Sequence, residues 1–320
     1  MSKAVRSPRV SHSIGIADLE MLLAATRHGS MAKAAASLDI SQPAISRAVA
    51  ELEATLGVRL LDRNRRGVVA TLYGEALARR ANAALDEIKL GMKEIESLAD
   101  PSTGELYIGS PEPLTEALLP DVIKRFWRNY PRVSINVVLA LAGEFANLRA
   151  RNIDFQINRL LPDFAAKDIE AETLFDEQLF VVTGIGNPWA NRRKISLGDL
   201  AEEKWVMQNN TSDNVAYVFG ARKMPAPRAT VAAYSAFLRN ELAASGDFLA
   251  ILTAPQLLVL RNQALKVKIL PIDLSDLSIK VAIFRLTGRT LSPVARLFLD
   301  YVRETCKRGK FAAAVRHTLA

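Results

Sequence analysis

The sequence predicts a multidomain protein: an all-α N-terminal domain of the winged helix-turn-helix type, a long linker helix and a larger α/β domain. Three observations lead to this prediction. The first 70 residues contain three short segments of helical periodicity separated by glycine and serine. The stretch 72–99 has no proline and one long apolar stripe. Beyond residue 103, strand-like and helical segments alternate, which is typical of α/β folds.

Composition excludes several classes of protein. Hydrophobic residues make up 49% and charged residues 24%, so the bulk of the chain is expected to be globular. One cysteine, Cys306, excludes an internal disulfide, and three scattered histidines exclude an HExxH zinc site. The apolar run 248–260 is too short to span a bilayer, and no signal-peptide pattern is present. We therefore expect a cytoplasmic protein without a metal, a cofactor or a membrane partner.

The net charge of +8 is unevenly distributed. Residues 1–70 hold ten basic and six acidic side chains, and residues 301–320 hold five and one, whereas the middle of the chain is neutral. A basic segment ahead of a neutral body indicates a polyanion-binding module. The alternative is a merely solvated basic face, and charge alone does not decide between the two.

The first three helices follow from their boundary residues. The first helix begins at Ile16 and ends at Gly29, Ser30 and Ser41 are N-cap candidates for the next two, and Gly57 ends the third. Two short helices, a tight turn and a third helix fit a helix-turn-helix. The following segment, Val58 to Thr71, has a basic turn between two apolar stretches and is therefore interpreted as a hairpin wing.

The next segment, 72–99, predicts a single long helix. Its apolar residues alternate spacings of four and three, as in a coiled-coil seam. The residues of this seam are Ala81, Leu85, Ile88, Met92, Ile95 and Ala99. We favour a helix that pairs two copies of the chain; the alternative is an amphipathic helix packed on its own domain.

Beyond a linker at 100–104, the pattern predicts a largely parallel sheet with helices. Strands are expected at Leu106–Ser110, Val133–Leu139, Phe155–Asn158, Leu179–Thr183, Trp205–Met207, Ala250–Leu252, Val267–Leu270 and Val281–Leu286. Helices are expected at Leu114–Tyr130, Glu144–Arg151, Val215–Arg222, Ser235–Ala244, Pro255–Arg261 and Pro293–Cys306.

The third helix carries a polar face in its first turns, opposite the apolar face of Ile45 and Val49. A recognition helix reads bases with its N-terminal residues. Gln42 can pair with adenine, Arg47 with guanine and Ser46 with either base. A polar solvated face is the alternative, but the basic wing beside this helix favours DNA.

The stretch from Leu19 to Gly74 resembles the DNA-binding domain of LysR-type transcriptional regulators. The matching features are Gly29-Ser30, Ala34-Ala35, Ser41-Gln42-Pro43-Ala44, Ser46, Leu52-Glu53, Leu56-Gly57, Arg63, Arg66-Gly67, Thr71 and Gly74. The rest of the chain agrees more loosely, through 104–109, 153–157, 187–190 and 197–200. Departures from the family pattern are Leu61, Ala70, Gln156 and Asn158.

The resemblance implies a winged domain at 1–71, a dimerisation helix at 72–100 and an effector-binding domain at 101–320. It implies base contacts from Gln42, Pro43, Ser46 and Arg47, with Ser41 at the same helix start. It implies phosphate contacts from Ser30, Lys33 and Thr71, and wing contacts from Arg63, Arg65 and Arg66. The family's proteins bind interrupted palindromes in promoter DNA and assemble as a dimer of dimers. RNA polymerase is a further candidate partner, and the nucleoid is the expected location.

The effector domain resembles a periplasmic binding protein with two α/β lobes. Lobe I would comprise about 104–173 and 274–320, and lobe II about 174–273. A ligand in such folds sits beyond the carboxyl ends of the strands, where helix N-termini favour carboxylates or phosphates. We therefore expect a small organic effector at Ser110, Glu112 and Thr115 of one lobe, and at Asn209 and Thr211 of the other. Glu112 is unusual for an anion site, so it could instead bind hydroxyls or a cation, or point to solvent.

Two other classes of function fit the sequence less well. An enzyme is not supported, because no Ser/His/Asp trio is suggested and Cys306, in a terminal helix, is expected to be inert rather than a redox sensor. A solute-binding transport protein would suit the two lobes. The attached helix-turn-helix and the missing signal peptide argue against it.

Overall fold

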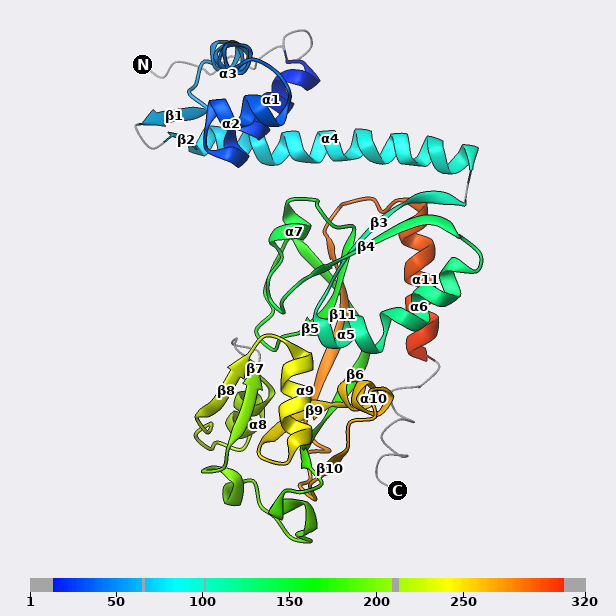
Figure 1. Ribbon diagram of the computed structural model, residues 1–320. Coiled ribbons are helices and arrows are strands. Elements are labelled where there is room, and N and C mark those ends of the chain that lie inside the picture. The colour runs from blue at the N-terminus through cyan, green and yellow to red at the C-terminus, as the bar shows by residue number, and fades with distance from the viewer. Residues whose placement is uncertain (1–13, 65–66, 101, 209–212, 308–320) are drawn as a thin grey trace. The chain divides into compact units, whose positions relative to one another are not determined.

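The computed structural model describes residues 14–64, 67–100, 102–208 and 213–307 (Figure 1). It divides into two compact units that meet between Met92 and Lys93, and each unit is described by itself. Among the described helices, none combines the length and the apolar character needed to cross a membrane.

The first unit confirms the predicted winged helix-turn-helix and the long helix. Its elements are α1 (Ile16–His28), α2 (Met31–Ser37), α3 (Gln42–Leu56), β1 (Leu61–Asn64), β2 (Gly67–Ala70) and most of α4 (Leu72–Ala99), whose last turns belong to the second unit. Gly29 and Gly57 end α1 and α3 with φ angles of 60° and 69°, the left-handed conformation that glycine adopts at little cost. Ser30 caps α2 as expected, since its side chain accepts the Lys33 N–H. Ser41 is the N-cap residue of α3, as expected, but its side chain makes no cap bond.

The core of this unit joins the three short helices to the wing. Leu22 of α1, Ile45 and Leu52 of α3, and Leu60 and Leu61 at the start of the hairpin are buried in one cluster. Burying such side chains stabilises the fold by about 1.5–3 kcal/mol each. The hairpin is therefore part of the hydrophobic core rather than an appended loop.

Two glycines allow the backbone segments of this unit to approach closely. A Cβ at Gly67 would lie 2.2 Å from the carbonyl oxygen of Gly29, and a Cβ at Gly74 would lie 2.0 Å from that of Leu60. The Val68 N–H donates to the same Gly29 oxygen over 2.8 Å. At these two positions, the wing and the start of α4 thus approach the rest of the unit so closely that only glycine, which has no side chain, fits.

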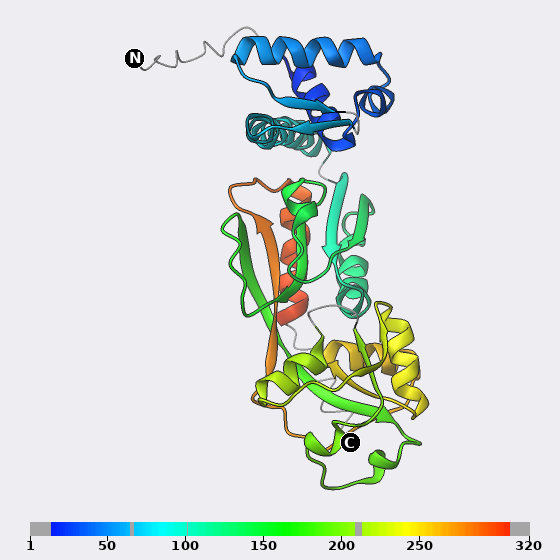
Figure 2. The ribbon, with the colours of Figure 1, turned by 90° about the vertical axis from the view of Figure 1, so that its left-hand side faces the viewer.

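The second unit has two α/β lobes (Figure 2). Lobe I contains β3 (Thr103–Ser110), α5 (Glu112–Ala117), α6 (Leu119–Trp127), β4 (Arg132–Leu139), α7 (Ala146–Arg149), β5 (Phe155–Leu160), β11 (Ser278–Leu286) and α11 (Pro293–Lys307). Lobe II contains the short helices η1 (Pro188–Asn191) and η2 (Gly198–Leu200), β7 (Trp205–Gln208), α8 (Asn214–Ala221), β8 (Ala229–Ala233), α9 (Ala236–Ser245), β9 (Leu249–Thr253), α10 (Ala254–Asn262) and β10 (Val267–Ile269). The strand β6 (Ile169–Gly184) runs through both lobes.

The strands follow the order β4-β3-β5-β11-β6-β9-β7-β8, with β10 on the other side of the lobe II end of β6. The predicted largely parallel sheet is only partly correct. Strand β3 is parallel to β4 and β5, and β7 is parallel to β8 and β9, but β11 and β6 run antiparallel to their neighbours. The reason is that β6 and β11 carry the chain between the lobes instead of following a βαβ crossover.

Three elements differ from the predicted ones. The helix expected at 114–130 is split into α5 and α6, because Pro120 lacks the N–H needed to continue the hydrogen-bond ladder of α5. The first half of β6 was missed because Glu170, Glu172 and Glu177 interrupt its apolar pattern, and β8 was not predicted.

Both lobes have helices on both faces of the sheet. In lobe I, Phe126 of α6 and Phe298 of α11 pack with Phe155 on one face, and α7 covers the other. In lobe II, Trp205 of β7 packs with Phe219 of α8 on one face of the sheet, while α9 and α10 cover the other face. The carboxyl ends of β3 and β5 in lobe I, and of β7 and β9 in lobe II, are left to form the facing surfaces.

A matched pair of glycine substitutions in α4 tests the close approach at the wing. Gly74→Ala should destabilise the protein by about 1–3 kcal/mol, since the added methyl group meets backbone that cannot move aside. Gly91→Ala, where nothing lies within 4 Å of the new methyl group, should stabilise it by about 0.5–1 kcal/mol. Thermal unfolding monitored by circular dichroism measures both. Equal effects of the two changes would contradict the close-approach argument.

Candidate nucleic-acid interface and interlobe cleft

The first turns of α3 form an exposed polar surface. Gln42, Pro43 and Arg47 are exposed and Ser46 is half-buried, whereas Ile45 on the opposite side of the helix is fully buried. The structure thus places the amide, the hydroxyl and the guanidinium on the solvent side of the helix. These groups carry the donors and acceptors that read base edges.

The remaining predicted DNA contacts are distributed around this surface. Ser41, Lys33 of α2 and Arg63 of the wing are exposed. Arg65 and Arg66 lie outside the described residues. The Thr71 hydroxyl donates to the Arg59 carbonyl oxygen over 2.7 Å and accepts the Gly74 N–H over 3.1 Å, so it caps the start of α4. The phosphate contact of Thr71 stays a prediction alongside this structural role.

The sequence reasoning missed the residue that joins the wing to α3. One carboxylate oxygen of Glu53 accepts the backbone N–H groups of Leu60 and Leu61 over 2.7 and 3.1 Å. This carboxylate fixes the start of the hairpin relative to the helix that carries Arg47. A glutamate in the last turns of a helix gives no sequence signal for such a role.

The lobe I side of the cleft begins where β3 ends. Ser110 is 2% exposed, and its hydroxyl lies 3.4 Å from the Pro111 carbonyl oxygen. Pro113 has no N–H, and the N–H groups of Leu114 and Thr115 donate to Pro111. The start of α5 therefore offers an anion fewer donors than the sequence suggested.

Glu112 joins the two lobes. Its carboxylate accepts the N–H of Ala236, the first residue of α9 in lobe II, over 2.7 Å. A carboxylate at a helix N-terminus is stabilised by the helix dipole. The predicted hydroxyl or cation contact of Glu112 is thus replaced, in this conformation, by a bridge from α5 to α9.

Charged groups gather around this bridge. Burial and the nearby Glu112 carboxylate raise the pKa of Glu116, and the buried Arg239 opposes the shift. Arg239 donates to the carbonyl oxygens of Ala233 and Tyr234 over 2.7 and 2.6 Å, and burial lowers its pKa. The cleft is therefore lined by charged groups of both signs.

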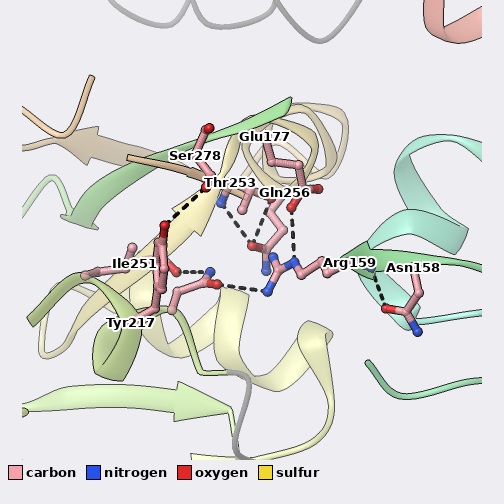
Figure 3. A network of polar contacts seen from close by, with 9 residues as sticks. Asn158, Arg159, Glu177, Tyr217, Ile251, Thr253, Gln256 and Ser278 are labelled. Carbon is pink, nitrogen blue, oxygen red and sulfur yellow. Dashed lines mark hydrogen bonds and ion pairs between the residues drawn. The ribbon is translucent and has the colours of Figure 1, made fainter. Parts of the chain in front are cut away.

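A second interlobe contact is centred on Arg159 at the end of β5 (Figure 3). Its guanidinium donates to Glu177 of β6 over 3.1 Å and to Asn214 of α8 over 2.8 Å. Asn214 in turn donates to the Ile251 carbonyl oxygen of β9 over 2.8 Å. Glu177 is 1% exposed, and this burial raises its pKa while Arg159 opposes the shift. A lobe I side chain is thereby bonded to one lobe II helix, α8, and to the strand shared between the lobes.

The described residues on the lobe II side of the cleft include several buried polar side chains. Asp213 caps α8 by accepting the Val215 and Ala216 N–H groups, and burial raises its pKa. A cavity of about 20 Å³ lies beside it, next to Arg239 and Gln256. This volume holds about one water molecule. The predicted ligand residues Asn209 and Thr211 lie outside the described residues.

Some of the polar residues at the cleft can be recognised from the sequence. Asp213 stands directly before a helix, the position of an N-cap. Gln156 and Asn158 were noted as departures, and their amide groups donate to the carbonyl oxygens of Leu141 and Ala140. Arg239 and Glu177 cannot be recognised in this way, because the residue pattern of α9 and that of β6 give no indication that a charged side chain is buried.

Two family models match the chain. The model described as "Bacterial regulatory helix-turn-helix protein, lysR family" matches residues 16–75, and "LysR substrate binding domain" matches residues 99–307. Among curated relatives, an uncharacterized HTH-type transcriptional regulator, YybE of Bacillus subtilis, is 30% identical over 89% of this chain and 96% of its own length. The regulator GbpR of Rhizobium radiobacter is 34% identical over 59% of this chain and 64% of its own length.

Solved structures show the same fold. A full-length OxyR variant from Pseudomonas aeruginosa matches 94% of this chain and 97% of its own, with 20% identity and a TM-score of 0.68. Full-length CbnR in complex with its target DNA matches 91% and 99%, with 23% identity and a TM-score of 0.52.

The buried pair at the cleft can be tested by removing one charge. Glu177→Gln should destabilise the protein by about 3–5 kcal/mol, because the Arg159 charge is then buried without a counter-charge. The double change Arg159→Met and Glu177→Met should recover much of this loss. Chemical denaturation followed by tryptophan fluorescence measures both variants. A double variant as unstable as the single one would show that packing, not charge, governs this contact.

Proposed function

The chain belongs to the LysR family of bacterial transcriptional regulators, and on this premise we propose that it binds an interrupted palindrome in promoter DNA and changes activity when a small organic effector enters its cleft. The exposed polar surface of α3 on a winged domain is the observation that carries the DNA-binding part. In this proposal residues 1–71 bind DNA, residues 72–100 pair two copies and residues 101–320 respond to the effector. A nucleoid location in the cytoplasm follows from the same role.

Base readout is assigned to the start of α3. Gln42, Ser46 and Arg47 contact base edges in the major groove, flanked by Ser41 and Pro43. Phosphate contacts are assigned to Ser30, Lys33 and Thr71. The wing residues Arg63, Arg65 and Arg66 reach the neighbouring minor groove or its phosphates.

The effector is assigned to the facing surfaces of the two lobes. Ser110, Glu112 and Thr115 belong to lobe I, and Asn209 and Thr211 to lobe II. The Glu112 bridge to α9 supports this assignment, because a ligand that contacts Glu112 would compete with the bond that joins the lobes. The effector thereby acts on the angle between the lobes.

Self-association is assigned first to α4. Along the predicted seam, Ala81 and Leu85 are buried within the chain, whereas Ile88, Met92 and Ile95 are exposed, Ile95 by 69%. We assign this exposed half to contacts with a second copy. Further apolar side chains are exposed on β4 and near the start of α9, namely Val137, Val138, Leu139, Tyr234 and Phe237. These side chains support a second interface in a dimer of dimers. RNA polymerase stays a candidate partner.

Peroxide sensing is a property of some relatives by name, such as the hydrogen peroxide-inducible genes activator of Pectobacterium carotovorum. The thiol of Cys306 does not support this role here. Burial raises its pKa to about 12, so the reactive thiolate is scarce at neutral pH.

Arg47→Ala tests the base-reading assignment. The change should weaken operator binding by about 1–3 kcal/mol and affect random DNA less, because the lost contact is to a base. Lys33→Ala is the matched control, since a lost phosphate contact weakens both DNAs equally and lowers the salt slope by about 1. Titrations at several salt concentrations measure these effects. Equal losses on both DNAs for Arg47→Ala would assign it to phosphate.

Acidic residues placed on α4 test the seam. Ile88→Asp with Ile95→Asp should lower the sedimenting mass and weaken operator binding, because two half-sites are no longer bound together. Lys89→Asp with Glu96→Asp changes the net charge by the same amount at exposed positions one residue along, and should leave the mass unchanged. Both seam residues are exposed, so the fold is expected to survive. An unchanged mass in the first variant would refute the seam.

A further inference from the structure

The tip of lobe II carries an open groove of about 610 Å³. It is formed by the loop that follows β6 and by β10, at the end of the lobe where β10 is drawn in Figure 1. Its apolar lining residues are Ile185, Ala190, Ile269, Leu270 and Pro271, and its basic ones are Arg192, Arg193 and Lys268. Ile185 is 60% exposed, so this apolar surface is open to solvent.

The basic side chains of this groove are not used inside the protein. Within the described ranges, no carboxylate pairs with Arg192, Arg193 or Lys268, and Lys194 and Lys266 add two more exposed cations beside them. Several arginines elsewhere in the second unit form ion pairs within the fold. Examples are Arg149–Asp168, Arg222–Asp276 and Arg303–Glu172, at 2.7, 2.6 and 2.7 Å. The cations at the tip therefore contribute no comparable internal stabilisation.

The backbone of the groove is held in place. The Asn187 side chain donates to the Gly246 carbonyl oxygen over 2.7 Å and accepts the Trp189 N–H over 2.9 Å. Strand β10 pairs with β6 along one edge, and in the described part of the chain no strand pairs with its other edge. An edge strand with free backbone groups is a template for an added strand.

We propose that this groove binds an extended acidic segment of another protein. Apolar side chains of the segment lie against Ile185 and Ile269, its carboxylates pair with Arg192, Arg193 and Lys268, and its backbone continues the sheet at β10. The apolar floor favours a peptide over nucleic acid, because phosphate contacts need cations but leave apolar side chains without a partner. The groove shares no residue with the interlobe contacts or with the DNA-binding surface of α3, so the proposal does not depend on the functions proposed above.

The probe is a short fluorescein-labelled peptide of alternating glutamate and valine, titrated with the full-length protein and followed by fluorescence anisotropy at low salt. The wild type should bind it. Arg192→Glu with Arg193→Glu should raise Kd by about tenfold or more, because like charges then face each other. Lys124→Glu with Arg261→Glu makes the same change in net charge at exposed positions outside the groove, and should leave Kd unchanged. Ile185→Ser should also weaken binding, although it changes no charge.

Several outcomes would overturn the proposal. The wild type could fail to bind the peptide, or the two double variants could have equal Kd values. Peptide binding could also be lost in Arg47→Glu but kept in the groove variant, Arg192→Glu with Arg193→Glu. A groove variant that loses affinity for random duplex DNA, while Ile185→Ser retains full peptide binding, would make this a nucleic-acid surface. A groove variant with a lower sedimenting mass would make it an interface between copies of the chain.

Discussion

One strand constrains the whole second unit. The first part of β6 pairs with β11 in lobe I, and its last residues pair with β9 and β10 in lobe II. A continuous strand cannot change its two ends independently, so any movement between the lobes must bend it or twist it. A bulge opposite Val281 and Ala282 lies in its lobe I half, where local twist is increased. The Arg159–Glu177 pair is attached to the same strand.

The two interlobe contacts differ in what they cost to break. Glu112 is half-buried and bonds a backbone N–H, so water can replace that bond when the lobes separate. Glu177 is 1% exposed and its Arg159 partner 11%, so separating that pair would leave a largely desolvated charge without its counter-charge. The Glu112 bridge is therefore the easier of these two polar contacts to break, and the Arg159–Glu177 pair is the more costly one.

The sequence was informative wherever a local rule decides the structure. Glycine ended α1 and α3, the basic turn between apolar pairs identified the wing, and the polar first turn of α3 identified the exposed surface. The sequence was uninformative where the role of a side chain depends on a bonding partner that is distant in the sequence. Glu53 is fixed by backbone N–H groups of the wing, and Glu112 by a helix start 124 residues away. Charges in β6 argued against a strand, because their compensation by Arg159 and Arg303 cannot be read from neighbouring residues.

The position of β11 and α11 at the end of the chain has a consequence for synthesis on the ribosome. The lobe I core requires Phe298 and Val302 of α11 and Ile283 of β11, whereas the lobe II core is complete once residues up to 279 have emerged. Since domains fold as units and early segments fold first, the winged domain and lobe II can form while lobe I still waits for its central strand. During that interval the edges of β5 and β6 that later receive β11 are unpaired, and unpaired strand edges can pair with other chains.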